Sequence, residues 1–261
     1  MNLSQINVNI SDYPVEFISL LTNTKVFDSS CSKEARVIFI DKDMGYFLKS
    51  APKGSLERQA KMTKYFHSKG LTSNVLSYIS NDLDWLLTEK IQGNDCTAIN
   101  HLKQPERLCD LLAETLAMLH SQDYSQCPIQ NHTELILAKA KQNKISDNFD
   151  KSHFPDSWGY KTPDEAWNVI EKSKNLLQQD SLLHGDYCLP NILLDNWKFS
   201  GFIDLDQSGV GDRHVDIFWG LWSLVWNLKT DKYRERFIDA YGRDKVNEEC
   251  LRLIAAIEVF G

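Results

Sequence analysis

The stretch LHGDYCLPNILLDNWKFSGFIDLDQSGVGDRHVD, residues 183–216, decides the fold of this chain. Within it, the apolar runs 192–194 and 199–203 flank a turn with Asp195-Asn196 at its tip, which predicts a β-hairpin. A histidine, a glycine and an aspartate stand just before the hairpin, at 184–186. The polar residues that matter most lie at the two ends of the hairpin: Asp186, Asn191 and Asp204.

The spacing of these three polar residues has a chemical reason. A loop that presents Asp186 and, five residues later, Asn191 can set a proton acceptor beside a hydroxyl while the amide oxygen reaches a metal. Asp204 arrives from the hairpin and can complete a Mg²⁺ site around nucleotide phosphates. The pattern therefore predicts phosphoryl transfer, with Asp186 as the catalytic residue and Asn191 and Asp204 as metal ligands. A structural hairpin with incidental polar ends is the alternative.

This segment resembles the signature of the aminoglycoside O-phosphotransferases, bacterial antibiotic kinases of the kanamycin and streptomycin type, whose fold is similar to that of protein kinases. The resemblance is densest over residues 182–216, where CLPN and SGFID are specific, and it extends more thinly over nearly the whole chain. It implies a bilobal, protein-kinase-like α+β fold: a small antiparallel β lobe with one helix, residues 1–92, and a larger, mainly helical lobe, residues 93–261, with ATP between them. It also implies Mg²⁺-dependent transfer of the γ-phosphate of ATP to an aminoglycoside hydroxyl, giving antibiotic resistance.

The composition is that of an ordinary globular protein. The 261 residues are 42% hydrophobic and 25% charged. The net charge of −7 argues against nucleic-acid binding and favours a cationic small substrate, although solubility accounts for it equally well.

The cysteines and the N-terminus indicate the compartment. Six cysteines are scattered without CxxC spacing, as expected for reduced thiols. The N-terminus lacks a basic and apolar leader pattern, and no run approaches the roughly twenty apolar residues of a spanning helix. We therefore expect a cytoplasmic protein with no membrane partner.

The first lobe is expected to hold the nucleotide. The apolar runs 37–40 and 46–49, joined by a turn rich in Asp and Gly, predict a hairpin. In the resembling kinases the polar loop at 28–32 covers the ATP phosphates, which implies a nucleotide contact for Ser32. The strand-end Lys49 is expected to reach the α- and β-phosphates, with a solvated lysine as the alternative.

The next segment departs from the family pattern. Residues 55–69 have helical periodicity, and in the resembling kinases this helix supplies a glutamate that pairs with the lysine. Here Gln59 stands at that position. Glu57 lies two residues away, about 200° around the helix axis, so we do not expect it to replace Gln59. We expect the Gln59 amide oxygen to accept a hydrogen bond from Lys49.

A hinge is predicted after two further strand patterns, at 76–79 and 85–88. The residues Glu89, Lys90 and Ile91 resemble the hinge between kinase lobes, which implies that their backbone groups contact the adenine. An ordinary linker is the alternative.

Helical patterns dominate the rest of the chain. An apolar stripe at 105–120 predicts a core helix with His120 as a structural histidine at its end, and another helix is expected over 132–143. Thr162-Pro163 marks a further helix start. His184 is expected to brace its loop through its ring nitrogens, and Arg213 to serve either the site or a structural ion pair.

The substrate end is inferred mainly from the resemblance. The long polar segment 146–163 reads as a binding loop, in which Asp156 matches acidic residues that meet the ammonium groups of the antibiotic; a solvated loop is the alternative. A helix is expected over 246–260, and Glu258 and the carboxylate of Gly261 are expected to face the same amines. Ile257 stands where the family usually has another acid.

The apolar helix expected at 216–226 holds a second departure. Related enzymes often carry a basic residue near Trp222 and an acid near Trp226. We expect the tryptophans to pack in the core, with an aromatic face for a cation or a sugar ring as the alternative. Gln207 replaces an arginine of the family.

Two other functions stay open on the sequence. One is a kinase of the same fold acting on another small alcohol, such as choline, a macrolide or a metabolite. The other is a nucleotide-binding module with weak catalysis, motivated by Gln59 and Gln207 but opposed by the complete set of Asp186, Asn191 and Asp204.

Overall fold

A computed structural model describes residues 4–31, 35–149 and 160–261. Contacts divide the chain into two compact units, the first made of residues 1–95 and 193–206, the second of residues 96–192 and 207–261. The first unit thus includes a segment from far along the chain, residues 193–206.

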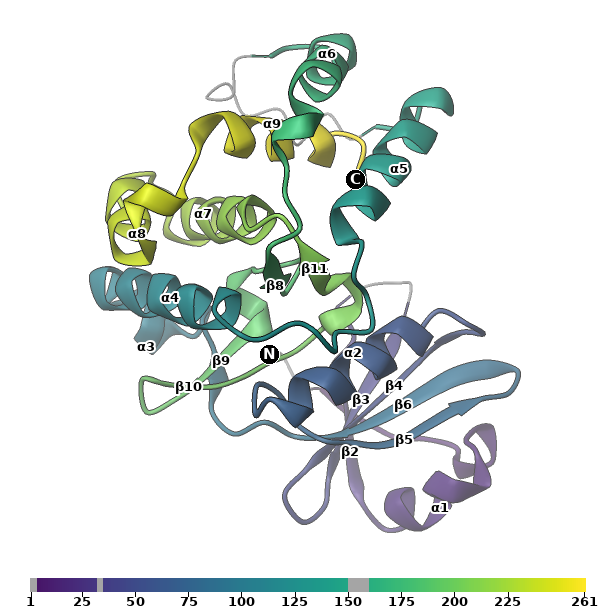
Figure 1. The fold of residues 1–261 in the computed structure, drawn as a ribbon. Helices are drawn as coiled ribbons and strands as arrows, with labels where there is room; N and C mark the ends of the chain where they lie inside the picture. Colours follow the sequence, from purple (N-terminus) through teal and green to yellow (C-terminus); the bar gives the residue numbers. More distant parts are fainter. Residues whose placement is uncertain (1–3, 32–34, 150–159) are drawn as a thin grey trace. The chain divides into compact units, whose positions relative to one another are not determined.

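The first unit is built on a six-stranded sheet with the order β1-β2-β3-β4-β6-β5 (Figure 1). Each neighbouring pair of strands in this sheet is antiparallel. The elements of the unit in chain order are β1 (Ser4–Ile6), α1 (Val15–Leu21), β2 (Lys25–Asp28), β3 (Arg36–Asp41), β4 (Tyr46–Pro52), α2 (Glu57–Ser68), β5 (Val75–Ser80), β6 (Leu83–Glu89) and β7 (Asn94–Asp95), followed by β9 (Ile192–Asp195), which begins at the boundary, and β10 (Lys198–Phe202).

The β3–β4 hairpin confirms the predicted one. Its turn contains Asp43 with φ of 51° and Gly45 with φ of 89°, both in the left-handed region that Asp and Gly tolerate. The expectation of a single helix in this lobe is wrong, since α1 is a second one. Its Phe17 and Leu21 are buried against the sheet, with the Phe17 and Trp85 ring centroids 6.3 Å apart.

The two helices cover opposite faces of the sheet. Alternate residues of β6 point to opposite sides. Trp85 and Leu87 join the core under α1, whereas Leu86 joins the core under α2 with Leu56 and Ala60. Burying both faces fixes the register of β6, because a slip of one residue would exchange its two sets of side chains.

The β9–β10 hairpin completes this unit. Its turn lies at Asn196 and Trp197, whose φ angles of 49° and 64° suit a tight two-residue turn. The hairpin joins β7 through β9, in a three-stranded sheet with the order β10-β9-β7. At its far end, the backbone N–H of Phe202 donates to the carbonyl of Leu71 (2.9 Å) and the hydroxyl of Thr72 donates to the carbonyl of Phe202 (2.6 Å). These bonds tie the hairpin to the segment that follows α2.

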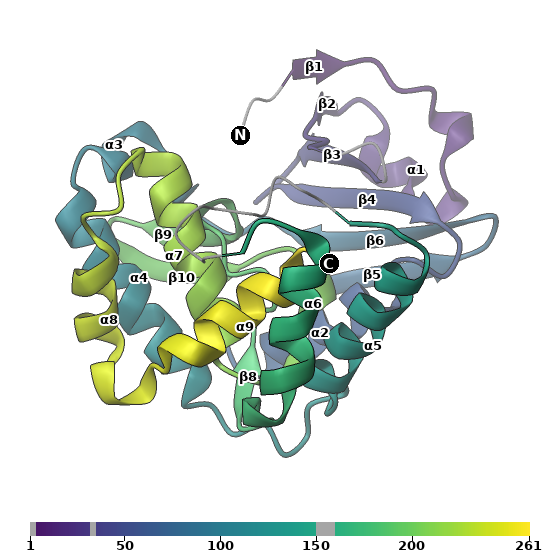
Figure 2. The ribbon, with the colours of Figure 1, turned by 90° about the horizontal axis from the view of Figure 1, so that it is seen from above.

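The second unit is mainly helical (Figures 1 and 2). Its elements are α3 (Ile99–Leu102), α4 (Pro105–His120), α5 (His132–Ile145), α6 (Pro163–Ser173), β8 (Ser181–Leu183), β11 (Gly209–Gly211), α7 (His214–Leu228), α8 (Arg234–Tyr241) and α9 (Glu248–Glu258). The antiparallel pair of β8 and β11 is the only sheet among the described residues of this unit.

Helix packing forms the core of the second unit. The predicted helix at 105–120 is α4, and its Leu108, Leu112 and Leu116 are fully buried. Helix α4 packs on α7 and α8, while α9 packs on α6 and α7, and α6 lies beside α9 in Figure 2. The expected start of α6 is confirmed, with the Thr162 side chain accepting a hydrogen bond from the backbone of Glu165 (3.2 Å).

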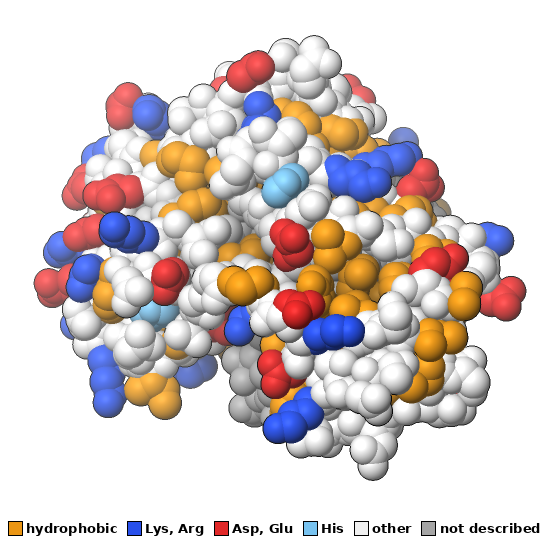
Figure 3. Space-filling view, turned by 90° about the horizontal axis from the view of Figure 1, so that it is seen from below, with side chains coloured by type: hydrophobic (Ala, Val, Ile, Leu, Met, Phe, Trp, Pro, Cys, Tyr) orange, Lys and Arg blue, Asp and Glu red, His pale blue; other side chains and the backbone are white. Residues whose placement is uncertain are grey.

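The distribution of surface charge and the hydrophobicity of the helices are relevant to the predicted absence of nucleic-acid and membrane partners. On the face seen in Figure 3, acidic and basic side chains are interspersed. The structure pairs several such groups, for example Arg243 with Asp239 (2.6 Å). No helix in the described ranges combines the length and the hydrophobicity that crossing a membrane requires.

Replacement of Asp84 tests how α2 is held on the sheet. Its fully buried carboxylate accepts hydrogen bonds from the Leu56 backbone at the start of α2 (2.9 Å), from Ser80 (2.6 Å) and from Tyr78 (3.0 Å). Asp84→Ala leaves these donors unsatisfied, so we expect the free energy of unfolding to fall by about 3 kcal/mol in urea denaturation. Asp84→Asn keeps one acceptor oxygen and should lose less; equal losses for the two variants would contradict this account.

Candidate active site

Lys49 lies at the centre of a polar cluster in the first unit. Its Nζ donates to Oε1 of Gln59 (2.8 Å) and to Oδ1 of Asp204 (3.0 Å). Asp204 follows β10, so the hairpin brings a residue 155 positions away in sequence to the lysine. The predicted hydrogen bond between Gln59 and Lys49 is present.

Gln59 changes the charge of this cluster. An ammonium can only donate, so the neutral amide presents its oxygen to Lys49. Glu57, as expected, does not replace it: its carboxylate pairs with Lys61 (2.6 Å) one turn further along α2. The Lys49 charge is therefore balanced by the carboxylate of Asp204 and not by a second acid on α2.

Asp204 combines strain and exposure. Its φ is 58°, in the left-handed region that costs most side chains energy and that Asp tolerates better than most. Its side chain is 52% exposed, whereas that of Lys49 is 22% exposed. The carboxylate is thus directed by the backbone and accessible to a ligand.

The predicted hinge residues lie at the end of β6 and directly after it, since Glu89 is its last residue. The backbone N–H of Glu89 donates to the carbonyl of Asn74 (3.2 Å) and that of Lys90 to the carbonyl of Gly45 (2.9 Å). Both N–H groups are therefore engaged within the first unit, which leaves the N–H of Ile91 as the candidate donor to an adenine. The other predicted nucleotide residue in this unit, Ser32, lies outside the described residues.

Asp186 and Asn191 form the centre of the second unit's polar site. The Asn191 Nδ2 donates to the Asp186 carboxylate Oδ2 (2.8 Å) and to the Asp186 carbonyl (3.0 Å). Both amide hydrogens are used in this way, so the amide plane is fixed and the Asn191 oxygen is presented as an acceptor. The loop is closed by the backbone N–H of Cys188, which donates to the Asp186 carbonyl (2.8 Å).

The buried carboxylate of Asp216 fixes the backbone of this loop through hydrogen bonds. It accepts from the backbone N–H of His184 (2.7 Å) and of Gly185 (2.7 Å), and it lies 3.2 Å from Nε2 of His120. Gly185 has φ of 84°, and a side chain there would collide with the carbonyl of Gln207. Only glycine therefore fits between His184 and Asp186.

The histidine predictions are confirmed by these contacts. His120 is 9% exposed and its other ring nitrogen lies 2.7 Å from the Tyr241 hydroxyl, as expected for a structural histidine. His184 is fully buried, and its Nδ1 accepts from the backbone N–H of Asp186 (3.3 Å). Because that nitrogen accepts from the loop, His184 braces it.

Cys188 and Ser223 connect the loop to α7. The Ser223 hydroxyl oxygen accepts from the backbone N–H of Leu189 (2.9 Å). Burial raises the pKa of the Cys188 thiol well above its usual range, and the charge of Asp186 and a hydrogen bond to it raise the pKa further. The thiol therefore stays protonated beside Asp186 and is not a nucleophile.

Glu258 lies at the end of α9, within electrostatic range of Asp186. Burial raises the pKa of Glu258 to about 7, the charge of Asp186 adds to this rise, and the charge of Lys139 and a hydrogen bond from Trp219 oppose it. The carboxylate also lies against Gly261, where an added Cβ would sit 2.8 Å from Oε2. Three residues predicted separately for catalysis and substrate binding are thus gathered in one region of the second unit.

Comparison with known proteins places this chain in a family. A model of the phosphotransferase enzyme family matches residues 27–254. A protein of Lactococcus lactis subsp. lactis (strain IL1403), named probable aminoglycoside 3'-phosphotransferase, is 50% identical to this chain over 261 residues, covering 100% of this chain and 99% of that protein. The chain belongs to the phosphotransferase enzyme family.

Solved structures confirm the fold of this phosphotransferase. The crystal structure of aminoglycoside-3'-phosphotransferase of type VIII superposes with a TM-score of 0.72 at 20% identity, covering 99% of this chain and 94% of that one. The structure of APH(3'')-Id from Streptomyces rimosus, in complex with ADP and streptomycin, has a TM-score of 0.69 at 19% identity, covering 86% and 90%. The predicted α+β fold of the aminoglycoside phosphotransferases is therefore correct.

The phosphotransferase has oxygen ligands suited to Mg²⁺. The described residues contain no group of three or more His, Cys, Asp or Glu side chains placed to hold a metal by themselves. Mg²⁺, however, is usually bound through one or two protein oxygens together with substrate phosphates and water. The accessible carboxylate of Asp204 in the first unit and the oriented amide oxygen of Asn191 in the second unit are each, taken separately, an oxygen ligand of this kind.

Two other sequence expectations have clear outcomes. Arg213 pairs with Asp180 (2.8 Å), so the structural ion pair is the correct alternative for this arginine. Core packing is the wrong expectation for Trp226, which is 60% exposed. Asp156, the predicted substrate residue in the polar loop, lies outside the described residues.

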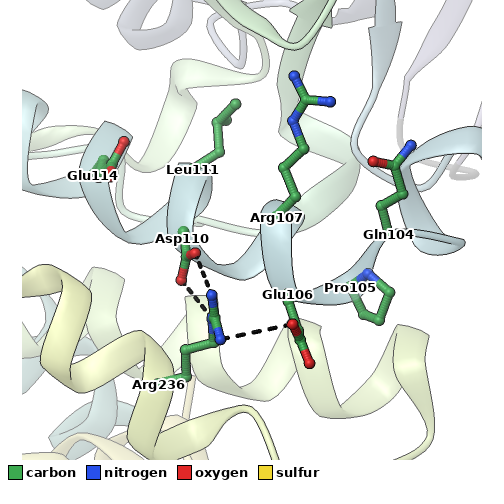
Figure 4. Close-up of a pocket in the computed structure, with 8 residues that line it drawn as sticks. All are labelled: Gln104, Pro105, Glu106, Arg107, Asp110, Leu111, Glu114 and Arg236. Carbon is green, nitrogen blue, oxygen red and sulfur yellow. Dashed lines mark hydrogen bonds and ion pairs between the residues drawn. The ribbon is translucent and has the colours of Figure 1, made fainter.

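A surface pocket elsewhere on the phosphotransferase is distinct from this site. It has a volume of about 640 Å³ and lies at α4 and α8 (Figure 4), lined by Gln104, Pro105, Glu106, Arg107, Asp110, Leu111, Glu114 and Arg236. None of the predicted site residues lines it. Arg236 makes two 2.6 Å hydrogen bonds to the Asp110 carboxylate across the two helices, which is a structural role.

The contacts of Asp216 were missed by the sequence reasoning, although a signal existed. An acid in the first turn of an otherwise apolar helix must find partners when it is buried. Ser223 and Trp219 carry no such signal, because a serine or a tryptophan in an apolar helix is ordinary.

Removal of the Asp216 carboxylate should destabilise the phosphotransferase strongly. Asp216→Ala leaves two buried backbone N–H groups without acceptors, so we expect a loss of about 3 kcal/mol in the free energy of unfolding. Asp110→Ala breaks the exposed pair with Arg236 in the same unit and should cost at most about 1 kcal/mol. Urea denaturation of both variants measures the difference, and similar losses would refute the role given to Asp216.

Proposed function

We propose that this chain transfers the γ-phosphate of ATP to the 3′-hydroxyl of an aminoglycoside antibiotic and thereby confers resistance. The observation that carries the proposal is the Asp186 carboxylate, oriented by Asn191 in a loop held by Asp216 and within electrostatic range of Glu258. The names of the relatives support the substrate class and the position of the hydroxyl.

In this proposal Asp186 acts on the acceptor hydroxyl. One carboxylate oxygen is held by Asn191, which fixes the orientation of the group. Asp186 then orients the hydroxyl and accepts its proton as the oxygen attacks the γ-phosphate. Phosphoryl transfer depends mainly on positioning and charge neutralisation, so a single well-placed carboxylate is enough for this step.

Lys49 serves the nucleotide. Its ammonium, oriented by Gln59, binds the α- and β-phosphates, and the Ile91 backbone with Glu89 and Lys90 is assigned to the adenine. Asp204 and Asn191 would hold Mg²⁺, which supplies positive charge beside the phosphate oxygens when it is bound. The neighbour solved with ADP and streptomycin supports a nucleotide and a cationic antibiotic as the two ligands.

The cytoplasm is the proposed compartment, because the reaction consumes ATP. All six cysteines lie in the described ranges as free thiols, which supports this assignment.

A substrate screen tests the proposal directly. ATP consumption is measured with kanamycin, with its 3′-deoxy counterpart, with streptomycin and with choline. We expect turnover with kanamycin and none with the 3′-deoxy compound. Turnover with the 3′-deoxy compound would move the reaction to another hydroxyl, and turnover with choline alone would favour the small-alcohol alternative.

Substitution of the two aspartates should separate their roles. Asp186→Asn should lower kcat by about a hundredfold or more and leave the Kd for ATP nearly unchanged, because the carboxylate acts on the acceptor. Asp204→Ala should weaken Mg²⁺-dependent ATP binding as well as turnover, because it removes a metal ligand. Isothermal titration with ATP at two Mg²⁺ concentrations, alongside steady-state kinetics, distinguishes these patterns. Turnover of Asp186→Asn within about tenfold of the parent would refute its assignment.

The pKa of Glu258 predicts a pH-dependent affinity for the antibiotic. Below its pKa of about 7 the carboxyl is neutral and attracts an ammonium weakly, so the KM for kanamycin should fall as pH rises through 7. At about pH 8 Glu258→Gln should raise this KM roughly tenfold, equivalent to about 1.4 kcal/mol, while the KM for ATP stays the same. The variant is also the control for titration of the antibiotic's own amines. A parallel pH dependence of KM in the two proteins would count against Glu258.

A further inference from the structure

Three tryptophans form a continuous aromatic stripe on one face of α7. Trp219, Trp222 and Trp226 are spaced three and four residues apart, which places them on the same side of the helix. The Trp219 and Trp222 ring centroids are 5.4 Å apart at 79°, and the Trp222 and Trp226 centroids are 5.5 Å apart at 6°. The outer two rings are therefore stacked face to face.

The inner end of the stripe belongs to the candidate active site. Trp219 hydrogen-bonds the carboxylate of Glu258, whose pKa is raised in part by Asp186. Ser223, on the same helical face, accepts from Leu189 in the loop that carries Asp186 and Asn191. The stripe thus begins beside the catalytic loop and the predicted substrate carboxylate.

The outer end of the stripe is open. Trp226 is 60% exposed, while its partner Trp222 is partly buried and holds it in place. The ammonium of Lys229 lies 4.2 Å from the centroid of the Trp226 ring. The ring face therefore already attracts a cation, and the group that occupies it sits on a long, exposed and flexible side chain.

We propose that Trp226, supported by Trp222, is a stacking platform for an amino-sugar ring of the substrate. The ring's ammonium takes the place of the Lys229 ammonium, and the C–H face of the sugar lies on the indole. An amino sugar combines an apolar ring face with a positive charge, the two properties that the exposed indole accepts. This inference rests on the proposed function and assigns a specificity-determining residue to it.

The proposal predicts opposite effects on the KM for kanamycin when Trp226 and Lys229 are replaced. Trp226→Ala should raise the KM for kanamycin about fivefold, equivalent to about 1 kcal/mol, with kcat and the KM for ATP unchanged. Trp226→Phe keeps a π face and should recover most of the affinity. Lys229→Gln removes the competing cation and should lower the KM for kanamycin by about twofold.

A control on the same helix isolates the aromatic contribution. Val225 is 41% exposed next to Trp226, so Val225→Ala changes an exposed apolar side chain of α7 without touching the stripe and should leave all constants unchanged. Isothermal titration of each protein with kanamycin gives Kd independently of turnover. Thermal denaturation confirms that the variants fold, as expected for a substitution at an exposed position.

The outcomes separate this inference from the function on which it rests. If the parent enzyme does not phosphorylate kanamycin or any other aminoglycoside, the proposed function fails. If the parent is active and Trp226→Ala leaves both KM and Kd within about twofold of the parent, the stacking platform is overturned while the function stands. An unchanged KM in Lys229→Gln overturns the exchange of ammonium groups.

Discussion

The buried carboxylate of Asp216 is the interaction on which the polar site of the second unit depends. It has no exposed surface, and an unpaired charge there would be very costly. Its oxygens accept from the two backbone N–H groups that precede Asp186 and also contact His120. Helix α7, which carries Asp216, is in turn packed on α4 and α9. The helical core therefore fixes the position of the loop that carries Asp186.

In the first unit, three different elements likewise position one polar cluster. The strand β4 carries Lys49, helix α2 carries Gln59 and the end of the hairpin carries Asp204. Gln59 provides a neutral amide where the family has an acid. Among the described residues, Lys49 therefore has one anionic partner in this cluster, Asp204, which is also the metal-ligand candidate. In the proposed function, a cation bound at Asp204 would leave the Lys49 charge free for phosphate oxygens, which would couple the binding of the cation and of the phosphates electrostatically.

In the proposed site, the acceptor end combines one acid of raised pKa with an aromatic surface. Burial raises the pKa of Glu258, the charge of Lys139 on α5 and a hydrogen bond from Trp219 on α7 oppose this rise, and the charge of Asp186 adds to it. Next to Glu258, the stripe of indole rings on α7 presents aromatic and uncharged surface. Recognition of a polycation by few carboxylates and by π faces depends on shape more than on net charge, since aromatic stacking needs a ring in a defined orientation.

The sequence by itself determined the family, the fold class and the local elements with strong patterns. Short-range patterns can be detected in a single sequence. They include the spacing of Asp186, Asn191 and Asp204, the hairpin between them and the apolar stripe of α4. The Gln59 contact followed from the resemblance to the family, and helix geometry excluded Glu57. The tertiary structure alone decided that α1 covers a face of the sheet, that Asp216 holds the loop and that Trp226 is exposed. Those outcomes depend on which distant elements pack against one another. The identity of an apolar residue on a helix does not determine whether another element covers it.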